Sequence, residues 1–65
     1  MEVDKDAFET LCKKHNVDGE EKDYMWKICG AFYNIALKVK GDTKTALCIA
    51  LTSIDTLFEA MESTG

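Results

Sequence analysis

The sequence predicts an all-α protein, and three observations support this fold class. The chain of 65 residues contains no proline and only four glycines, and these two residue types are the least favourable in a helix interior. Its hydrophobic residues make up 46% of the chain and fall in two long blocks, where they recur at helical three- and four-residue spacing. A short polar turn separates the blocks. We therefore expect one domain, in which a short N-terminal helix packs on a long antiparallel helical hairpin.

The first helix is expected over residues 4–14. Acidic residues stand in its first turn and two lysines in its last, which is the charge order that the helix dipole favours. The polar run from His15 to Gly19 then ends the helical pattern. The apolar positions of the segment share one helical face: Ala7, Phe8, Leu11 and Cys12.

The second helix is expected over residues 19–40. Asp18 followed by Glu21 resembles a capping box, and Gly41 stands where a helix typically stops. The helical spacing predicts one core-facing stripe: Met25, Ile28, Cys29, Phe32, Ile35, Ala36 and Val39. A second apolar line lies on a different side of the same helix: Trp26, Gly30, Tyr33 and Leu37.

The third helix is expected over residues 43–62, with Asp42 or Thr43 as its N-cap. Its first two turns are apolar on all sides, from Ala46 to Leu51. Because a single hairpin covers only one stripe per helix, the remaining apolar surface indicates association, and we expect a homo-oligomer. The predicted core stripe of this helix is Leu47, Ala50, Leu51, Ile54, Leu57, Phe58 and Met61.

The charge of the chain argues against DNA binding. Twelve acids against eight lysines give a net charge of −4, and the chain contains no arginine, whereas a nucleic-acid footprint requires clustered cations. The lysines that could attract an anion lie mainly in residues 23–44, which hold four lysines and two acids. A small anionic ligand is therefore easier to accommodate than a duplex.

The cysteines and the N-terminus indicate where the protein acts. Cys12, Cys29 and Cys48 lack the spacing of a zinc site or a disulfide framework, and we interpret them as small core residues in a reducing compartment. The N-terminus is acidic, and the longest apolar run is six residues, too short for a membrane span. We expect a soluble cytoplasmic protein that does not bind membranes.

Residues for catalysis or for a cofactor are hard to find. His15, the single histidine, is interpreted as a solvated or capping residue rather than a catalytic base. Asp55 and Glu59 share one helix face, but without a third ligand they are typical of a solvated surface. The chain also lacks a glycine-rich phosphate loop. We predict no enzyme, no cofactor and no metal.

Anion recognition by a few residues remains possible, with an ordinary alternative for each. Lys27 stands beside Trp26 in an apolar, aromatic stretch, where its ammonium group either meets a phosphate or simply reaches water. Gly30 permits close approach of a ligand or a backbone, or is a tolerated helical glycine. The segment from Asp42 to Thr45 is either an anion site at a helix N-terminus or a plain N-cap.

Three motifs together resemble a known family: KICG at residues 27–30, GDTK at residues 41–44 and ALTSIDTLFEAM at residues 50–61. They are similar to the small helical phage proteins that act as anti-CBASS cyclic-nucleotide sponges. The resemblance implies a homo-oligomer that sequesters cyclic di- and trinucleotide messengers without cleaving them. It also implies immune evasion in the cytoplasm of the host cell.

The resemblance assigns ligand-binding roles to individual residues. Lys27 matches a lysine that contacts the phosphate, and Gly30 matches the glycine one turn later. Lys44, beside Thr43 and Thr45, falls near the place where the family puts a basic residue. The tyrosine and arginine that the family uses near its N-terminus have no counterpart here. The ring that stacks on a base is expected from Tyr24, Phe8 or Trp26.

A different function class stays open. The N-terminal third is rich in acids and could imitate a polyanion, which favours an interaction module or inhibitor that binds a basic host protein. A run of acids on a small helix is also common on a solvated face. The acids concerned are Glu2, Asp4, Asp6, Glu9, Asp18, Glu20, Glu21 and Asp23.

Overall fold

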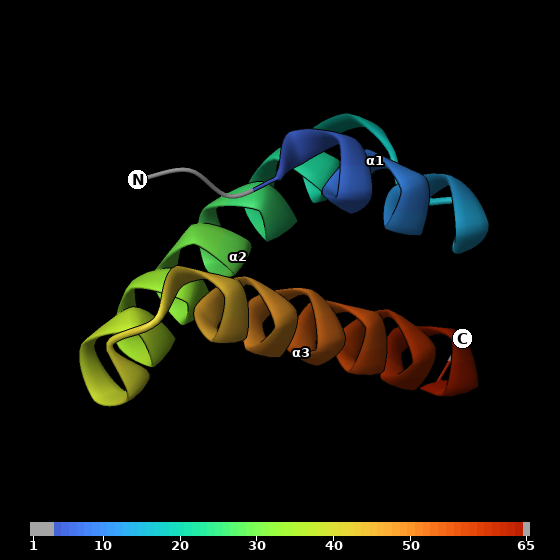
Figure 1. Cartoon of the computed structure of the whole chain (residues 1–65). Helices are drawn as coiled ribbons and strands as arrows, with labels where there is room; N and C mark the ends of the chain where they lie inside the picture. Colours follow the sequence, from blue (N-terminus) through green and yellow to red (C-terminus); the bar gives the residue numbers. More distant parts are fainter. Residues whose placement is uncertain (1–3, 65) are drawn as a thin grey trace.

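The computed structural model describes residues 4–64, and these residues form three helices (Figure 1). Helix α1 is Lys5–Lys14, α2 is Gly19–Lys40 and α3 is Thr43–Thr64. The long helices α2 and α3 pack antiparallel. Helix α1 lies over the end of this hairpin that is away from the α2–α3 turn (Figure 1). The predicted all-α class and the short helix on an antiparallel hairpin are confirmed, and α3 ends two residues later than expected.

The turn after α1 sets the position of everything near its C-terminus. Asn16 takes the left-handed conformation with φ of 57°, which asparagine tolerates better than most residues. The Asn16 N–H then donates to the Lys13 carbonyl at 3.3 Å, and the Val17 N–H to the Cys12 carbonyl at 2.8 Å. This pair of bonds closes a Schellman motif. It leaves His15 as the C-cap of α1.

The predicted start of α3 and the predicted end of α2 are right. Gly41 has φ of 70° and donates its N–H to the Leu37 carbonyl at 2.7 Å, so it ends α2 as expected. Asp42 caps α3, since its carboxylate accepts the Thr45 N–H at 2.8 Å. The capping box expected at the start of α2 is wrong, because Asp18 makes no side-chain capping bond in the described chain. Gly19 follows Asp18 with φ of 63°, so the chain enters the helix through an irregular turn.

On each long helix the buried residues form a narrower stripe than the spacing predicted. On α3 the fully buried positions recur every four residues, and the line begins at Ala46 rather than Leu47. On α2, Tyr33 was expected on the second apolar line, but it is buried at 3% exposure. The complete set of buried residues is Phe8, Cys12, Val17, Met25, Cys29, Tyr33, Ala36, Ala46, Ala50, Ile54 and Phe58.

Four residues expected in the core stripes lie at the surface instead. Ile35 and Val39 of α2 are 62% and 73% exposed, and Leu57 and Met61 of α3 are more than one third exposed. Near the hairpin turn the buried side chains are those of the small residues Ala36, Ala46 and Ala50, and small side chains at a contact permit two helices to pack at a short interaxial distance, which leaves Ile35 and Val39 beside the contact rather than in it. Apolar surface therefore remains exposed near the turn, on a different part of α2 from the one predicted.

Along residues 4–64, none of the helices combines the length and apolar character that crossing a bilayer requires.

Candidate functional site

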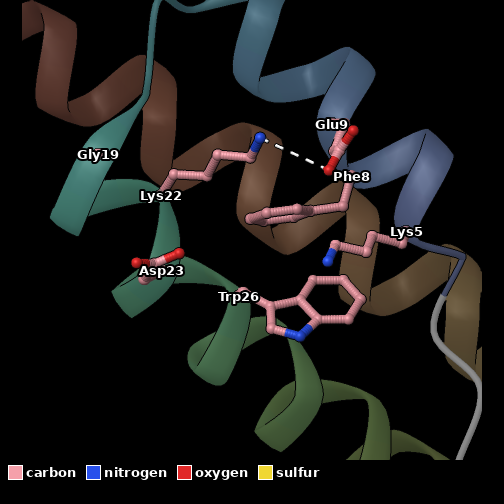
Figure 2. Close-up of a pocket in the computed structure, with 7 residues that line it drawn as sticks. All are labelled: Lys5, Phe8, Glu9, Gly19, Lys22, Asp23 and Trp26. Atoms are coloured by element: carbon pink, nitrogen blue, oxygen red, sulfur yellow. Dashed lines mark ion pairs between the residues drawn. The ribbon is translucent and has the colours of Figure 1, made fainter.

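A pocket of about 270 Å³ lies between α1 and the first turns of α2 (Figure 2). It brings an indole ring and two lysine side chains into one concavity. Because α1 is short and Gly19 has no side chain, the start of α2 is left open beside it. We refer to this concavity as the α1–α2 pocket, and its lining residues are Lys5, Phe8, Glu9, Gly19, Lys22, Asp23 and Trp26.

The aromatic part of the pocket is built from both helices. Phe8 of α1 packs against Trp26 of α2 with ring centroids 5.0 Å apart and the planes tilted by 57°. Phe8 is 1% exposed, so it supports the indole from the core side, whereas Trp26 is only partly buried. The Lys5 ammonium lies 5.7 Å from the Trp26 ring centre (Figure 2), a cation–π distance. The indole is therefore the ring that a ligand can reach.

The charged side chains of the pocket are two lysines and two acids, so their formal charges cancel. The Lys22 ammonium lies 3.5 Å from a Glu9 carboxylate oxygen (Figure 2), and both side chains are about one third exposed. This pair joins α1 to α2, and Asp23 adds a second acid at the pocket. An anion that enters must compete with Glu9 for Lys22, but an exposed ion pair is worth only about 0–1 kcal/mol. The pocket offers binding groups for a planar ring and an anion.

The predicted residues Lys27 and Tyr24 lie together in a separate, shallow depression on the outer side of α2. Tyr24 is 64% exposed, so its ring is accessible for stacking. The other residues that line the depression are three acids, Glu20, Glu21 and Asp23. Lys27 is thus surrounded mostly by negative charge, which weakens its attraction for a phosphate. Gly30 follows within the same helix and is half-buried.

The predicted residues Thr43, Lys44 and Thr45 lie at the opposite end of the hairpin. Asp42 already occupies two of the donors there, since its carboxylate accepts both the N–H and the hydroxyl of Thr45. These two bonds, the hydroxyl first, hold the pKa of Asp42 below its usual value. From Lys27 to its end at Lys40, α2 runs for 13 more residues, or about 20 Å. The structure of one chain therefore does not bring Lys27 and Lys44 together.

The cysteines differ from one another. Cys12 and Cys29 are buried in the core as predicted, and burial raises the pKa of both thiols. Cys48 is exposed on α3, so its predicted place in the core is wrong. It is expected to be the reactive thiol of the three, because thiol reagents need access and thiolate character.

A second cluster of polar side chains lies where the end of α1 faces α3. The His15 side chain is only 5% exposed, and its Nε2 lies 2.7 Å from the Asp55 carboxylate. Its Nδ1 contacts the Glu62 carboxylate, and its ring packs on Phe58 with centroids 5.4 Å apart. Of the two predicted roles of His15, the solvated one is wrong, whereas the capping one agrees with its position as the C-cap of α1. Glu62 first, and then Asp55, raise the pKa of His15.

This cluster also supplies a third partner for the Asp55 and Glu59 pair, which the sequence alone left as a solvated surface. Ligand atoms of His15, Asp55 and Glu59 all lie within 4.8 Å of one another. The neighbouring Lys14 ammonium lies 3.9 Å from Asp55 and is 62% exposed. We refer to His15, Asp55, Glu59, Glu62 and Lys14 together as the His15 cluster.

Comparison of the chain with protein-family models, with curated proteins and with solved structures finds no match. The resemblance to the cyclic-nucleotide sponges is therefore still a prediction from the motifs.

The sequence analysis did not mark two residues of the α1–α2 pocket, Lys5 and Lys22. The available signal was their spacing, since Lys5 and Phe8, and Lys22 and Trp26, share one helical face as i, i+3 and i, i+4 pairs.

Proposed function

We propose that this protein is a non-enzymatic binding protein that sequesters cyclic oligonucleotide messengers, as the phage anti-CBASS sponges do. The observation that carries the proposal is the α1–α2 pocket, where Trp26 and the cations of Lys5 and Lys22 line one concavity (Figure 2). A cyclic dinucleotide carries the complementary features: a planar base that suits the indole and charged phosphates that suit the lysines. The proposed site of action is the cytoplasm of the host cell.

Binding in this pocket follows from ordinary contacts. A base stacks on the face of Trp26 over which the Lys5 ammonium lies, an interaction worth about 1–3 kcal/mol per base. Lys5 moves from the indole to a phosphate, and Lys22 exchanges the Glu9 carboxylate for a second phosphate oxygen. Because the Lys22–Glu9 pair is partly exposed, we expect its loss to cost less than these contacts gain.

The assembly that we propose is a homo-oligomer with the ligand between protomers. In one chain about 20 Å of α2 separates Lys27 from the turn that precedes Lys44, so both lysines can contact one small ligand only if they come from different copies. Ile35 and Val39, exposed near the hairpin turn, supply apolar surface for contact between copies. In this arrangement Gly30, Thr43 and Thr45 lie at the margin of the ligand site.

The test is a titration of the purified protein with cyclic di- and trinucleotides, followed by Trp26 fluorescence. The chain contains a single tryptophan, so quenching by a stacked base reports on this pocket alone. Lys22→Gln is expected to weaken binding by about tenfold or more, and Lys44→Gln is expected to do the same if the site lies between protomers. Lys13→Gln, an exposed lysine of α1 outside the pocket, is the matched control.

Three results would contradict the proposal. The first is the absence of quenching and of any rise in melting temperature with every cyclic nucleotide. The second is equal quenching by linear dinucleotides, which would indicate a general affinity for nucleotides. The third is wild-type binding by Lys22→Gln, which would place the ligand outside the α1–α2 pocket.

A second function is favoured by the depression around Tyr24. Three acids surround this exposed ring, and an aromatic residue within an acidic patch suits a partner protein with a basic surface. The alternative proposal is an inhibitor that binds a basic host protein, and it includes Asp18 and the acids of α1. Glu2 of the predicted acidic run lies outside the described residues.

The alternative function is tested with a different set of substitutions. Under the alternative, Tyr24→Ala combined with Glu20→Lys is expected to abolish capture of the host partner, and cyclic nucleotides are expected neither to quench Trp26 nor to raise the melting temperature of the wild type. The reverse pattern in this double variant, with nucleotide binding lost and partner capture retained, would assign the depression to the ligand.

A further inference from the structure

We propose that the His15 cluster is a binding site for one divalent transition-metal ion of the Zn²⁺ type, with His15, Asp55 and Glu59 as its ligands. The site is independent of the α1–α2 pocket and of the proposed nucleotide binding. It joins the C-cap of α1 to the second half of α3.

The geometry of the three ligands is close to that of a formed site. Zn²⁺ takes histidine nitrogen and carboxylate oxygen at about 2.0–2.2 Å in a tetrahedral arrangement, so two ligands of one ion lie about 3.3–3.6 Å apart. The ligand atoms of His15, Asp55 and Glu59 already lie within 4.8 Å of one another. Glu59 is exposed, so a small rotation of its side chain closes the remaining gap.

The orientation of the imidazole fits a metal ligand. Glu62 contacts Nδ1, which directs the Nδ1 proton toward Glu62 and leaves Nε2 as the coordinating atom. A carboxylate on the far nitrogen of a ligating histidine is the usual outer partner in zinc sites. Nε2 itself faces the Asp55 carboxylate at 2.7 Å. When the ion enters between them, the Nε2 proton is released to water, and the ion takes its place.

The local charge also favours a divalent cation. Three carboxylates, from Asp55, Glu59 and Glu62, gather around one imidazole, and Lys14 is the cation that an ion pair places beside them. Lys14 is mostly exposed and lies 3.9 Å from Asp55, so it can move into water at little cost. A nitrogen ligand among the oxygens selects zinc and similar ions over Mg²⁺ and Ca²⁺, which prefer oxygen alone.

The ion has a structural consequence for α1. This helix is attached to the hairpin through its buried Phe8 and Cys12 and through the Lys22–Glu9 pair. At the end of α1, Lys14 and His15 already contact Asp55, and a metal at the His15 cluster replaces the direct His15–Asp55 contact with coordination by both residues. The ion stabilises the folded protein by mass action because the unfolded chain lacks the site.

The experiment measures thermal unfolding and calorimetric binding of Zn²⁺, with Cys48→Ser in every variant so that the exposed thiol does not bind the ion. We expect one ion per chain, a melting temperature that rises with Zn²⁺, and no comparable rise with Mg²⁺. Glu59→Gln is expected to weaken binding by more than tenfold, because it removes a ligand and leaves the hydrogen bonds of His15 in place. Glu20→Gln, an exposed acid on α2, is the matched control.

Two further variants separate the roles of the neighbours. Glu62→Gln is expected to weaken Zn²⁺ binding by about 10–100-fold, the usual effect of losing an outer partner. Lys14→Gln is expected to tighten binding, because it removes the competing cation. In the wild-type ligand set, the His15 ring resonances in an NMR spectrum should shift with the first equivalent of Zn²⁺. Unchanged His15 resonances, or equal affinity in Glu59→Gln and Glu20→Gln, would overturn the proposal.

Discussion

The position of the core line on the two long helices leads to a direct comparison of two substitutions. Ile54 is 0% exposed in the centre of α3, whereas Val39 is 73% exposed near the end of α2. Both were expected in the core from their spacing. The structure therefore predicts that Ile54→Ala is strongly destabilising and that Val39→Ala is nearly neutral.

The expected magnitudes follow from burial. Removing a fully buried isoleucine to alanine costs about 2–5 kcal/mol, and the milder Ile54→Val costs about 0.5–1.5 kcal/mol. In a domain of this size about 1 kcal/mol lowers the melting temperature by about 4–8 °C, so Ile54→Val should lose about 4–8 °C at the middle of that range. Ile54→Ala could leave little folded protein, because a chain this short has only a small reserve of stability. Val39→Ala removes little buried surface and improves helix propensity, so its change should stay within about 0.5 kcal/mol.

The assay is thermal unfolding followed by far-ultraviolet circular dichroism at several protein concentrations. If Val39→Ala lowered the melting temperature as much as Ile54→Val at every concentration, the assigned core line on α2 would be refuted. If instead the melting temperature of Val39→Ala were lowered only at high protein concentration, the result would show that another copy covers Val39. That outcome would support the proposed homo-oligomer and leave the fold of the single chain intact.

Three further predictions test individual features. Asp42→Asn should lower the melting temperature near neutral pH. Because the folded pKa of Asp42 lies below its usual value, its contribution is present above the unfolded pKa and is lost as pH falls through the folded pKa, so wild type and variant should converge in acid. A thiol reagent should modify Cys48 rapidly in the native protein and reach Cys12 and Cys29 only on unfolding; three equally reactive thiols would contradict their burial. Glu9→Gln should strengthen anion binding in the α1–α2 pocket by freeing Lys22, whereas weaker binding would show that Glu9 holds Lys22 in its binding position.

The secondary structure was predictable from the sequence because its signals are local. Gly41 ends α2 and Asp42 caps α3 through contacts within four residues, and the absence of proline leaves long helices uninterrupted. The faces of these helices were harder to predict. From Tyr24 onward every turn of α2 carries apolar residues, so several registers satisfy the same spacing. In the register that the structure adopts, the buried residues near the turn are Ala36, Ala46 and Ala50.

The candidate sites depend on contacts between distant parts of the chain, and sequence spacing does not contain this information. His15 lies 40 residues from Asp55 and 47 from Glu62, so no local pattern joins them. The same is true of Lys22 and Glu9, which meet only because the Asn16 turn folds α1 back along α2. A prediction of a third ligand for Asp55 and Glu59 would have required the position of α1 on the hairpin.

The distribution of charge along the hairpin makes a last prediction about how copies associate. Between residues 24 and 54 the chain has four lysines and a single acid, and Lys38, Lys40 and Lys44 are exposed near the turn. The far end of the hairpin carries the acids around Tyr24 and those of the His15 cluster. If copies of the proposed homo-oligomer pack with opposite ends together, these charges attract one another, and salt screens the attraction because the Debye length is only about 10 Å at 0.1 M. Sedimentation should therefore show weaker association at high salt. Association that strengthens with salt would instead assign the contact to the exposed apolar side chains of Ile35 and Val39, since added salt screens like-charge repulsion and leaves apolar burial intact.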